Sequence, residues 1–461
     1  MPIATTNPAT GETLKTFPVL SFHEIQTKIS LADDVYQKSF LSLEATQKKR
    51  RDGLLHMAEL LIDQKEALGK LITLEMGKTL ASAIQEIEKC ALNCQYYAEN
   101  GLQGLNAEPI PLPDDRRRAE IRYLPIGTVL AVMPWNFPFW QVIRCAAPIL
   151  LSGNSMLLKH ASNVPQCSEA IENLFIQAGF EPGVFQSLLI GSEQVAFVIQ
   201  DVRVHGVTLT GSEAAGKSVG SLASKSIKKS VLELGGSDPF IVMPSANISR
   251  AAEVAVKARM ICNGQSCIAA KRFIIHGKVY DQFKKYFIEN MMKIKMGDPM
   301  DPSTALGPVV SIKAREELHS LVMDAVGKGG RLLLGGKIPE GDGSFYPATV
   351  LDQVPKEARV IQEEVFGPVA VLYQVATLRE AIKVANSTRF GLGASFWSRE
   401  EDEISTATHQ IQSGSVFVND LVASDPHFPF GGVKSSGYGR ELGQVGLREF
   451  TNIKTVVNSR E

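Results

Sequence analysis

The sequence has no run of about 20 apolar residues, the length that a helix needs to cross a membrane. Its longest apolar runs are interrupted by glycine, proline or charged residues. Neither a basic nor an apolar segment follows Met1, so no secretory signal is expected. An excess of one charge is missing too, because 48 Lys and Arg stand against 49 Asp and Glu. This balance argues against nucleic-acid and membrane partners, and we expect a cytoplasmic protein.

Cysteine is scarce, with six residues in a chain of 461. So few thiols in so long a chain do not form a disulfide framework, and reduced cysteines are expected. Cys90 and Cys94 are one helical turn apart, which is a spacing that metal ligands use. No second Cys/His pair has the spacing to complete a tetrahedral site, so we expect no metal.

The length predicts two or three domains. Residues 21–99 are rich in Leu, Ala, Glu and Lys with helical periodicity, which predicts long amphipathic helices. The basic run 48–51 lies among them and is expected on a solvated helix face. A proline-rich segment at 106–113 then ends the helical region.

Short β-rich runs alternate with helical ones after this break. We predict strands at 128–133, 155–158, 185–190, 206–209 and 230–234, with a helix at 166–178. A second series begins with a strand at 239–243 and continues with a helix at 250–260, a strand at 272–275 and a helix at 280–293. Such alternation is typical of mostly parallel sheets with crossover helices. Two series that meet near residue 235 predict two lobes with a cleft between them.

Cys267 follows the run Asn263-Gly264-Gln265-Ser266, which puts small and polar residues directly before a thiol. Such residues let backbone N–H groups approach a substrate oxygen. The thiolate is the working nucleophile, and a free cysteine has a pKa of about 8.5, so this role needs help from the surroundings. The pattern indicates a nucleophile; the alternative is a buried structural cysteine in a polar turn.

Glu233 and Asn136 are candidates to act with this thiol. Glu233 ends an apolar run before Gly235 and Gly236, where backbone can pass close to other atoms, and its carboxylate could activate water. Asn136 lies between prolines in Pro-Trp-Asn-Phe-Pro, and its amide could stabilise an oxyanion. Taken alone, Glu233 could equally face solvent, and Asn136 could bond its own backbone.

Two further runs have features of phosphate sites. Gly211-Ser212-Glu213-Ala214-Ala215-Gly216 follows a strand and opens a helix, whose first N–H groups favour phosphate. It is not a full Gly-x-Gly-x-x-Gly motif, so a plain turn is the alternative. Lys159 ends another strand and could contact phosphate or ribose, or simply face solvent.

Read in order, the segments Pro-Trp-Asn-Phe-Pro, Leu-Lys, Thr-Gly-Ser, Glu-Leu-Gly-Gly, Gly-Gln-x-Cys, Glu-Glu-Val-Phe-Gly-Pro and Pro-Phe-Gly-Gly resemble the aldehyde dehydrogenase superfamily over essentially the whole chain. The resemblance implies an α/β fold. A Rossmann-like cofactor lobe would span 1–109 and 128–233, and an α/β catalytic lobe 234–437. A β oligomerisation arm would use 110–127 and 449–461. Its exposed edge needs covering, so a homodimer or a dimer of dimers is expected.

The resemblance also implies roles for single residues. Cys267 would be the nucleophile, Glu233 the general base, and Asn136 with the Cys267 N–H the oxyanion donors. Coenzyme-A-acylating relatives lack a carboxylate at position 233, so hydrolysis of the thioester is expected. Residues expected to bind NADP or NAD are Trp135, Lys159, Ser162, Gly211, Ser212, Glu364 and Phe366. Among them, the resemblance implies that Lys159 and Ser212 contact the adenosine half, and that Glu364 and Phe366 hold the nicotinamide ribose and ring.

Arg144 narrows the expected substrate. It occupies a position in the family's substrate tunnel where succinate-semialdehyde dehydrogenases carry Arg, and a guanidinium suits a far carboxylate. The alternative is a salt bridge to a neighbouring helix. Other members with that activity have a second Arg where Ile261 stands here, so another contact is needed, possibly from Ser424.

Ser162 bears on the cofactor. NAD-preferring members usually carry Glu at this position, where it binds the ribose hydroxyls and repels a 2′-phosphate. A neutral hydroxyl that follows Lys159 should tolerate the phosphate, so NADP is expected to be preferred over NAD.

We therefore expect oxidation of succinate semialdehyde to succinate through a thiohemiacetal and a thioester on Cys267. The alternatives are another short aldehyde, such as glutarate semialdehyde, an aromatic aldehyde or lactaldehyde, or a catalytically silent relative. A reversible disulfide between Cys262 and Cys267 is a further hypothesis, with a passive Cys262 thiol as its alternative.

Overall fold

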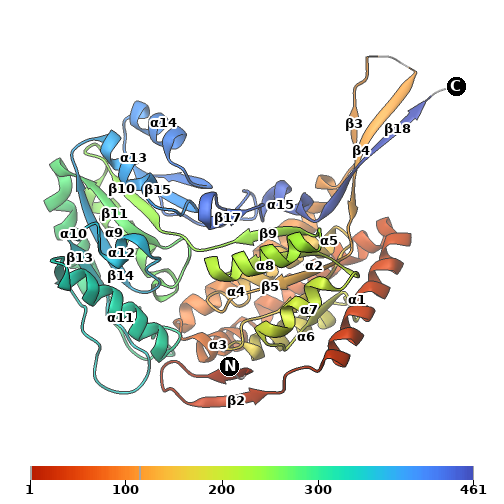
Figure 1. Cartoon of the computed structure of the whole chain (residues 1–461), viewed down its shortest axis with the longest axis horizontal. Coiled ribbons are helices and arrows are strands. Elements are labelled where there is room, and N and C mark those ends of the chain that lie inside the picture. The colour runs from red at the N-terminus through yellow and green to blue at the C-terminus, as the bar shows by residue number, and fades with distance from the viewer. Residues whose placement is uncertain (1–2, 114–115, 460–461) are drawn as a thin grey trace.

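The computed structural model describes residues 3–113 and 116–459. The expected lobe and arm segments 1–109, 110–127 and 449–461 therefore include residues 1–2, 114–115 and 460–461, which lie outside the described residues. Within the described ranges, no helix is both long and apolar enough to span a membrane. Two α/β units and a projecting β arm make up the molecule (Figure 1).

Four helices precede the first sheet, which confirms the prediction for 21–99. They are α1 (Phe22–Leu41), α2 (Leu43–Asp63), α3 (Lys65–Met76) and α4 (Leu80–Gly104). The Ser21 side chain accepts from the Glu24 N–H and the Glu24 carboxylate accepts in return, so α1 starts with a capping box. Gly77 ends α3 in the left-handed conformation at φ 84°, and the Thr79 hydroxyl caps α4. A short antiparallel pair, β1 (Ile3–Thr6) and β2 (Thr13–Phe17), lies before them.

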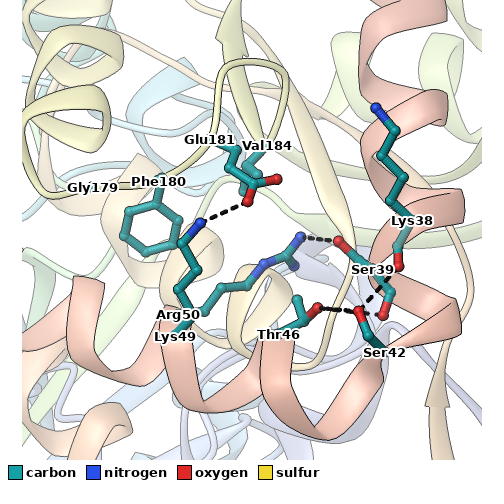
Figure 2. Close-up of a pocket in the computed structure, with 10 residues that line it drawn as sticks. All are labelled: Lys38, Ser39, Ser42, Thr46, Lys49, Arg50, Gly179, Phe180, Glu181 and Val184. Carbon is teal, nitrogen blue, oxygen red and sulfur yellow. Dashed lines mark hydrogen bonds and ion pairs between the residues drawn. The ribbon is translucent and has the colours of Figure 1, made fainter.

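The expectation that the basic run 48–51 forms a solvated face is wrong for Arg50. This side chain is 4% exposed and donates to the Leu150 and Asn154 carbonyls and to the Ser39 hydroxyl. Figure 2 shows it reaching from α2 toward Ser39 on α1, while Lys49 pairs with Glu181 at the surface. Arg50 therefore ties the helical layer to the first sheet through three hydrogen bonds to protein oxygens.

The first sheet has the order β17-β9-β8-β5-β6-β7. Every pairing in it is parallel except that of β17, as the alternation of strands and helices predicted. Its strands are β5 (Thr128–Val132), β6 (Ser155–Lys159), β7 (Phe185–Ser187), β8 (Val204–Thr210), β9 (Lys229–Glu233) and β17 (Gly437–Tyr438). The helices between them are α5 (Trp140–Leu151), α6 (Pro165–Gln177), α7 (Val195–Gln200) and α8 (Glu213–Lys225).

The second sheet has the order β12-β13-β14-β11-β10-β15-β16, and only β12 runs antiparallel to its neighbour. Its strands are β10 (Asp238–Val242), β11 (Ala270–His276), β12 (Arg331–Leu334), β13 (Thr349–Asp352), β14 (Val369–Val375), β15 (Gly393–Trp397) and β16 (Ser415–Val418). The accompanying helices are α9 (Ile248–Met260), α10 (Tyr280–Met292), α11 (Ile312–Gly327), α12 (Arg359–Gln362), α13 (Leu378–Asn386) and α14 (Glu401–Gln410). The last helix, α15 (Gly443–Glu449), packs against α4 and α5 beside the first sheet. The predicted elements at 239–243, 250–260, 272–275 and 280–293 are confirmed.

A three-stranded sheet projects from these units (Figure 1), in the order β18-β4-β3. Its strands are β3 (Glu108–Ile110), β4 (Arg117–Pro125) and β18 (Thr451–Ser459). β18 pairs with β4 along its whole length, from Thr451 opposite Pro125 to Ser459 opposite Arg117. Among the described strands β18 has no second neighbour, so it is an open edge.

Candidate active site

Neighbouring strands of the first sheet bring the expected site residues to one edge. β5 leads into Trp135 and Asn136, β6 ends at Lys159, β8 ends at Thr210, and β9 ends at Glu233. Because these strands are parallel, their carboxyl ends lie together, and ligands of open α/β sheets bind at this edge.

Three cavities follow one another from this edge toward the second sheet. The largest, of about 910 Å³, contains Lys159 and Ser162. Trp135 and Ser212 line both this cavity and a second one of about 290 Å³. The second cavity also contains Asn136, Gly211, Glu364, Phe366 and Cys267.

Cys267 lines the third cavity as well, which measures about 390 Å³ and includes Arg144 and Ser424. The thiol therefore lies where two cavities meet, one rich in expected cofactor residues and the other in expected substrate residues. With this arrangement, an aldehyde carbon bonded to the sulfur from one cavity would lie next to a nicotinamide ring held in the other.

Burial raises the pKa of the Cys267 thiol to about 12, although Lys271 and Arg144 act in the opposite direction. The Lys271 ammonium donates to the Ser266 and Cys267 carbonyls at 2.9 and 2.7 Å, and it is 1% exposed. At neutral pH the thiol form predominates, so attack on a carbonyl needs a group that removes the proton.

The backbone before Cys267 leaves the helical conformation in a defined way. α9 ends at Met260, and Cys262, Asn263 and Gly264 follow with φ of 53°, 56° and 77°. The Asn263 amide donates to the Gly77 and Pro308 carbonyls, both at 2.9 Å. These bonds hold two left-handed non-glycine residues and set the position of the sulfur.

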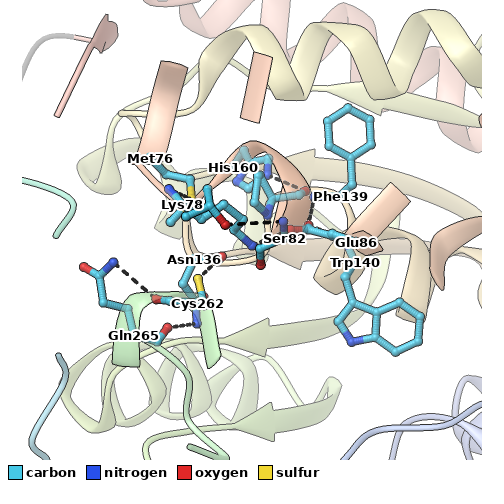
Figure 3. Close-up of polar contacts among 12 residues, drawn as sticks. Met76, Lys78, Ser82, Glu86, Asn136, Phe139, Trp140, His160, Cys262 and Gln265 are labelled. Carbon is cyan, nitrogen blue, oxygen red and sulfur yellow. Dashed lines mark hydrogen bonds and ion pairs between the residues drawn. The ribbon is translucent and has the colours of Figure 1, made fainter. Parts of the chain in front are cut away.

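Asn136 is 4% exposed, and its amide donates to the Gln265 carbonyl at 2.8 Å. The alternative that it bonds its own backbone is therefore wrong. An amide NH₂ group has two hydrogens, and this bond uses one of them at the cavity that Cys267 shares. The Cys262 thiol donates to the Asn136 carbonyl at 3.0 Å (Figure 3), so it lies against this loop.

Glu86 and Lys78 hold the same loop from α4 and the turn before it. One Glu86 oxygen accepts from the Phe139 and Trp140 N–H groups at 2.8 and 2.9 Å, and the other pairs with Lys78 at 2.5 Å. Both side chains are buried, and the Lys78 ammonium lies 3.9 Å from the centre of the Phe137 ring. Figure 3 shows this network above Asn136 and Cys262. A buried ion pair that also serves two backbone donors fixes the start of α5.

Glu233 is 2% exposed, and neither carboxylate oxygen has a hydrogen-bond partner among the described residues. Burial raises its pKa well above the usual range, Glu441 adds to this, and Arg144 and Arg440 oppose it. Glu233 is not among the described residues that line any of the three cavities. The carboxylate lies against Gly431, where a Cβ atom would approach it to 2.6 Å. To reach water beside Cys267, this side chain has to rotate.

The residues expected to hold the nicotinamide half lie together. A Glu364 oxygen accepts from the Gly236 N–H at 3.0 Å, and a Cβ at Gly235 would collide with the same carboxylate. The close approach expected of this glycine pair is thus confirmed. The Phe366 ring meets Trp135 edge-on, with ring centres 5.8 Å apart.

The residues expected at the adenosine half of the cofactor include a cation, Lys159, and the N-terminus of α8. The Ser212 hydroxyl caps α8 by accepting from the Ala215 N–H at 3.2 Å. The Lys159 ammonium donates to the His160 carbonyl at 2.9 Å, and burial lowers its pKa. A helix N-terminus, a lysine and aromatic rings along one elongated space fit a dinucleotide.

Arg144 does line the third cavity, but its guanidinium is engaged. Its Nε pairs with Glu441, one NH₂ group donates to the Thr210 hydroxyl at 3.2 Å, and its plane lies 4.8 Å from the Phe430 ring centre. Glu441 precedes α15 and is not on a helix. The salt bridge expected as the alternative for Arg144 is therefore present, but its partner is not a helical residue. Its role toward a substrate stays a prediction.

Sequence reasoning missed Lys271, Lys89, Glu441 and the pair of Lys78 and Glu86. A signal for Lys271 was present, because a lysine stands inside the otherwise apolar strand 270–276. The other residues carry no local signal, because the residues around each of them are equally compatible with a charged side chain that is exposed to solvent.

A model of the aldehyde dehydrogenase family matches residues 1–456. The chain belongs to the aldehyde dehydrogenase family. Among curated relatives, an aldehyde dehydrogenase of Paenarthrobacter nicotinovorans is 47% identical over 100% of both chains. A succinate-semialdehyde dehydrogenase [NADP(+)] 1 of Mycobacterium ulcerans is 48% identical over 99% of each chain.

The solved structure of succinic semialdehyde dehydrogenase from Streptococcus pyogenes with NADP+ is 35% identical. It matches with a TM-score of 0.96 over 99% of this chain and 100% of that one. This agreement confirms the predicted α/β aldehyde dehydrogenase fold and the prediction that the chain is an enzyme of this family. The predicted domain boundaries and the roles of single residues stay predictions.

Proposed function

We propose that this aldehyde dehydrogenase oxidises succinate semialdehyde to succinate, with NADP preferred over NAD. The observation that carries the proposal is the third cavity, in which Cys267 meets Arg144 and Ser424. Basic and hydroxyl donors near a partly buried thiol favour an aldehyde that bears a carboxylate. Relatives at 48 and 49% identity are named succinate-semialdehyde dehydrogenase [NADP(+)], which supports the same substrate and cofactor.

The proposed chemistry uses residues of both cavities. The Cys267 thiol loses its proton to water in the cavity as its sulfur bonds to the aldehyde carbon, and the oxygen that becomes negative is held by the second Asn136 hydrogen and the Cys267 N–H. A bound nicotinamide, held by Glu364 and Phe366, supplies the two-electron acceptor for the resulting thiohemiacetal. The Glu233 carboxylate then rotates toward the thioester and takes a proton from water, which releases the acid and returns the thiol.

The NADP preference rests on Ser162 and Lys159, which line the largest cavity together. A serine hydroxyl and an ammonium can both donate to a 2′-phosphate. Glu193 lines the same cavity and raises the pKa of Lys159 against the effect of burial, so the phosphate would also meet one negative charge. This mixture favours a moderate preference rather than exclusion of NAD.

The substrate is tested with a panel of aldehydes, each assayed by the absorbance of the reduced nicotinamide with NADP and with NAD. We expect the highest kcat/KM for succinate semialdehyde, with butanal and an aromatic aldehyde about 10- to 150-fold lower, since a charged hydrogen bond contributes about 1.5–3 kcal/mol. Equal values for butanal and the semialdehyde would contradict the proposal. An absence of turnover with every aldehyde would favour a catalytically silent relative.

We further propose a cytoplasmic homodimer, or a dimer of dimers, that is joined through the arm. The support is the open β18 edge, where Ile453 and Val457 are 60 and 51% exposed. Exposed apolar edges are normally covered. Cell fractionation tests the location.

A further inference from the structure

The third cavity contains a second cation that sequence reasoning did not find. Lys89 lies on α4 and lines this cavity together with Cys267, Arg144 and Ser424. Its ammonium donates to the Ser424 hydroxyl oxygen at 2.8 Å and lies 4.2 Å from the centre of the Trp140 ring. Within the described residues it forms no ion pair. The direct contacts of this half-buried ammonium, a hydroxyl and an aromatic ring, are neutral, so a bound anion would compensate its charge.

The other buried charges at this cavity are already matched within the protein, and Lys257, which also lines it, is exposed to solvent. Arg144 pairs with Glu441. Glu86 pairs with Lys78 and accepts from two backbone N–H groups. Among the cations at this cavity that are shielded from water, Lys89 is therefore the one whose charge is least compensated, and an incoming carboxylate gains most from it.

Ser424 adds a directed hydrogen. Its oxygen accepts from Lys89 and also from the Trp140 indole N–H at 3.1 Å. A hydroxyl has two lone pairs and one hydrogen, so both acceptor positions are used and the hydrogen is left to donate. The Ser424 side chain is 7% exposed and lines the cavity, where an oxyanion would be the fitting acceptor.

The position of Ile261 agrees with this arrangement. Ile261 lines the same cavity with an apolar side chain, so no cation comes from the segment just before Cys267. Lys89 supplies one from α4 instead, on the side where Ser424 lies.

We propose that Lys89 and Ser424 together bind the far carboxylate of the substrate, and that Lys89 determines specificity for carboxylated aldehydes. This inference rests on the proposed oxidation of a semialdehyde and adds the residue that selects it. The two ammonium hydrogens not used by Ser424 and the Ser424 hydroxyl hydrogen would donate to the carboxylate oxygens, with the Arg144 guanidinium as the second positive charge.

The test compares kcat/KM for succinate semialdehyde and for butanal in the wild type, Lys89→Met and Lys89→Arg. We expect Lys89→Met to lower the ratio of the two values about 10- to 100-fold through the carboxylated substrate alone, and Lys89→Arg to keep most of it. Lys257→Met is the matched control, because Lys257 lines the same cavity but is exposed. It should change the ratio less than about threefold.

A second measurement does not depend on turnover. Succinate should slow the labelling of Cys267 by iodoacetamide in the wild type and in Lys89→Arg, and far less in Lys89→Met. An unchanged ratio and unchanged protection in Lys89→Met, or an equal effect of Lys257→Met, would overturn the role of Lys89. A wild type that shows no preference for the semialdehyde would instead overturn the proposed function itself.

Discussion

Glu233 shows at the scale of one residue how burial and chemistry conflict. Burial raises the pKa of its carboxyl group, which also lacks hydrogen-bond partners among the described residues. This state is unfavourable for a purely structural group. The arrangement suits a base that is released toward water only when needed.

If Glu233 hydrolyses the thioester, Glu233→Gln should form the acyl-enzyme and then stall. We expect a burst of about one reduced nicotinamide per active site, followed by a steady rate about 100-fold or more below that of the wild type. Stopped-flow absorbance measures both phases. A variant without a burst, or one with a normal steady rate, would show that Glu233 acts elsewhere or not at all.

Ser162 should decide between the cofactors. Ser162→Glu places a carboxylate where a 2′-phosphate is proposed to lie, so kcat/KM with NADP should fall about 10- to 100-fold, while the value with NAD changes little or rises. Ser162→Gln has a similar size without the charge and should show only a small loss with NADP. Equal losses with both cofactors would mean that position 162 does not face the phosphate.

Lys89 predicts a pH dependence that depends on the substrate. Burial and the nearby Arg144 lower the pKa of Lys89 to about 8, against Cys90, Asp425 and Glu86. The ammonium is therefore present below pH 8 and is lost as the pH rises through it. The kcat/KM ratio of succinate semialdehyde to butanal should fall by up to about tenfold between about pH 7 and pH 9, as the charged fraction of Lys89 falls. In Lys89→Arg the ratio should stay level, and a level ratio in the wild type would count against the assignment.

At the scale of elements, the pair of Lys78 and Glu86 joins the turn before α4 to the loop that carries Asn136. Lys78→Met would leave the Glu86 carboxylate buried without its cation, which we expect to lower the free energy of unfolding by about 3–5 kcal/mol. The surface pair of Lys65 and Glu88 is a matched control, with side chains 34 and 40% exposed. Lys65→Met should lower the free energy of unfolding far less, because solvent screens the exposed pair. Urea denaturation measures both, and equal losses would mean that the buried pair is not special.

Helices and strands themselves were largely predictable. Helix caps such as Ser21 and Thr79, and strands such as 128–132, depend on residues that are close in the sequence. Local hydrogen bonds and the pattern of burial follow from the spacing of these residues. Arg50 was not predictable, since the carbonyls that it binds lie 100 and 104 residues away.

For the whole molecule, the arm should control assembly. Val457→Lys puts a charge on the exposed face of β18, and we expect it to shift a dimer toward monomer with unchanged circular dichroism. Lys454→Glu, on the opposite face of the same strand, is the control and should stay assembled. Light scattering after size-exclusion chromatography gives the mass of each. A wild type that is monomeric would contradict the proposed assembly directly.

The sequence alone determined the family, the alternation of strands and helices, and the thiol, carboxylate and amide expected to carry the chemistry. These are properties of short motifs and their order, so they can be recognised without knowledge of the tertiary structure. The tertiary structure decided which charges remain unmatched: it paired Arg144 with Glu441 and brought Lys89 to Ser424 across 335 residues. Such contacts depend on how distant elements pack, and side-chain charge by itself does not specify a partner.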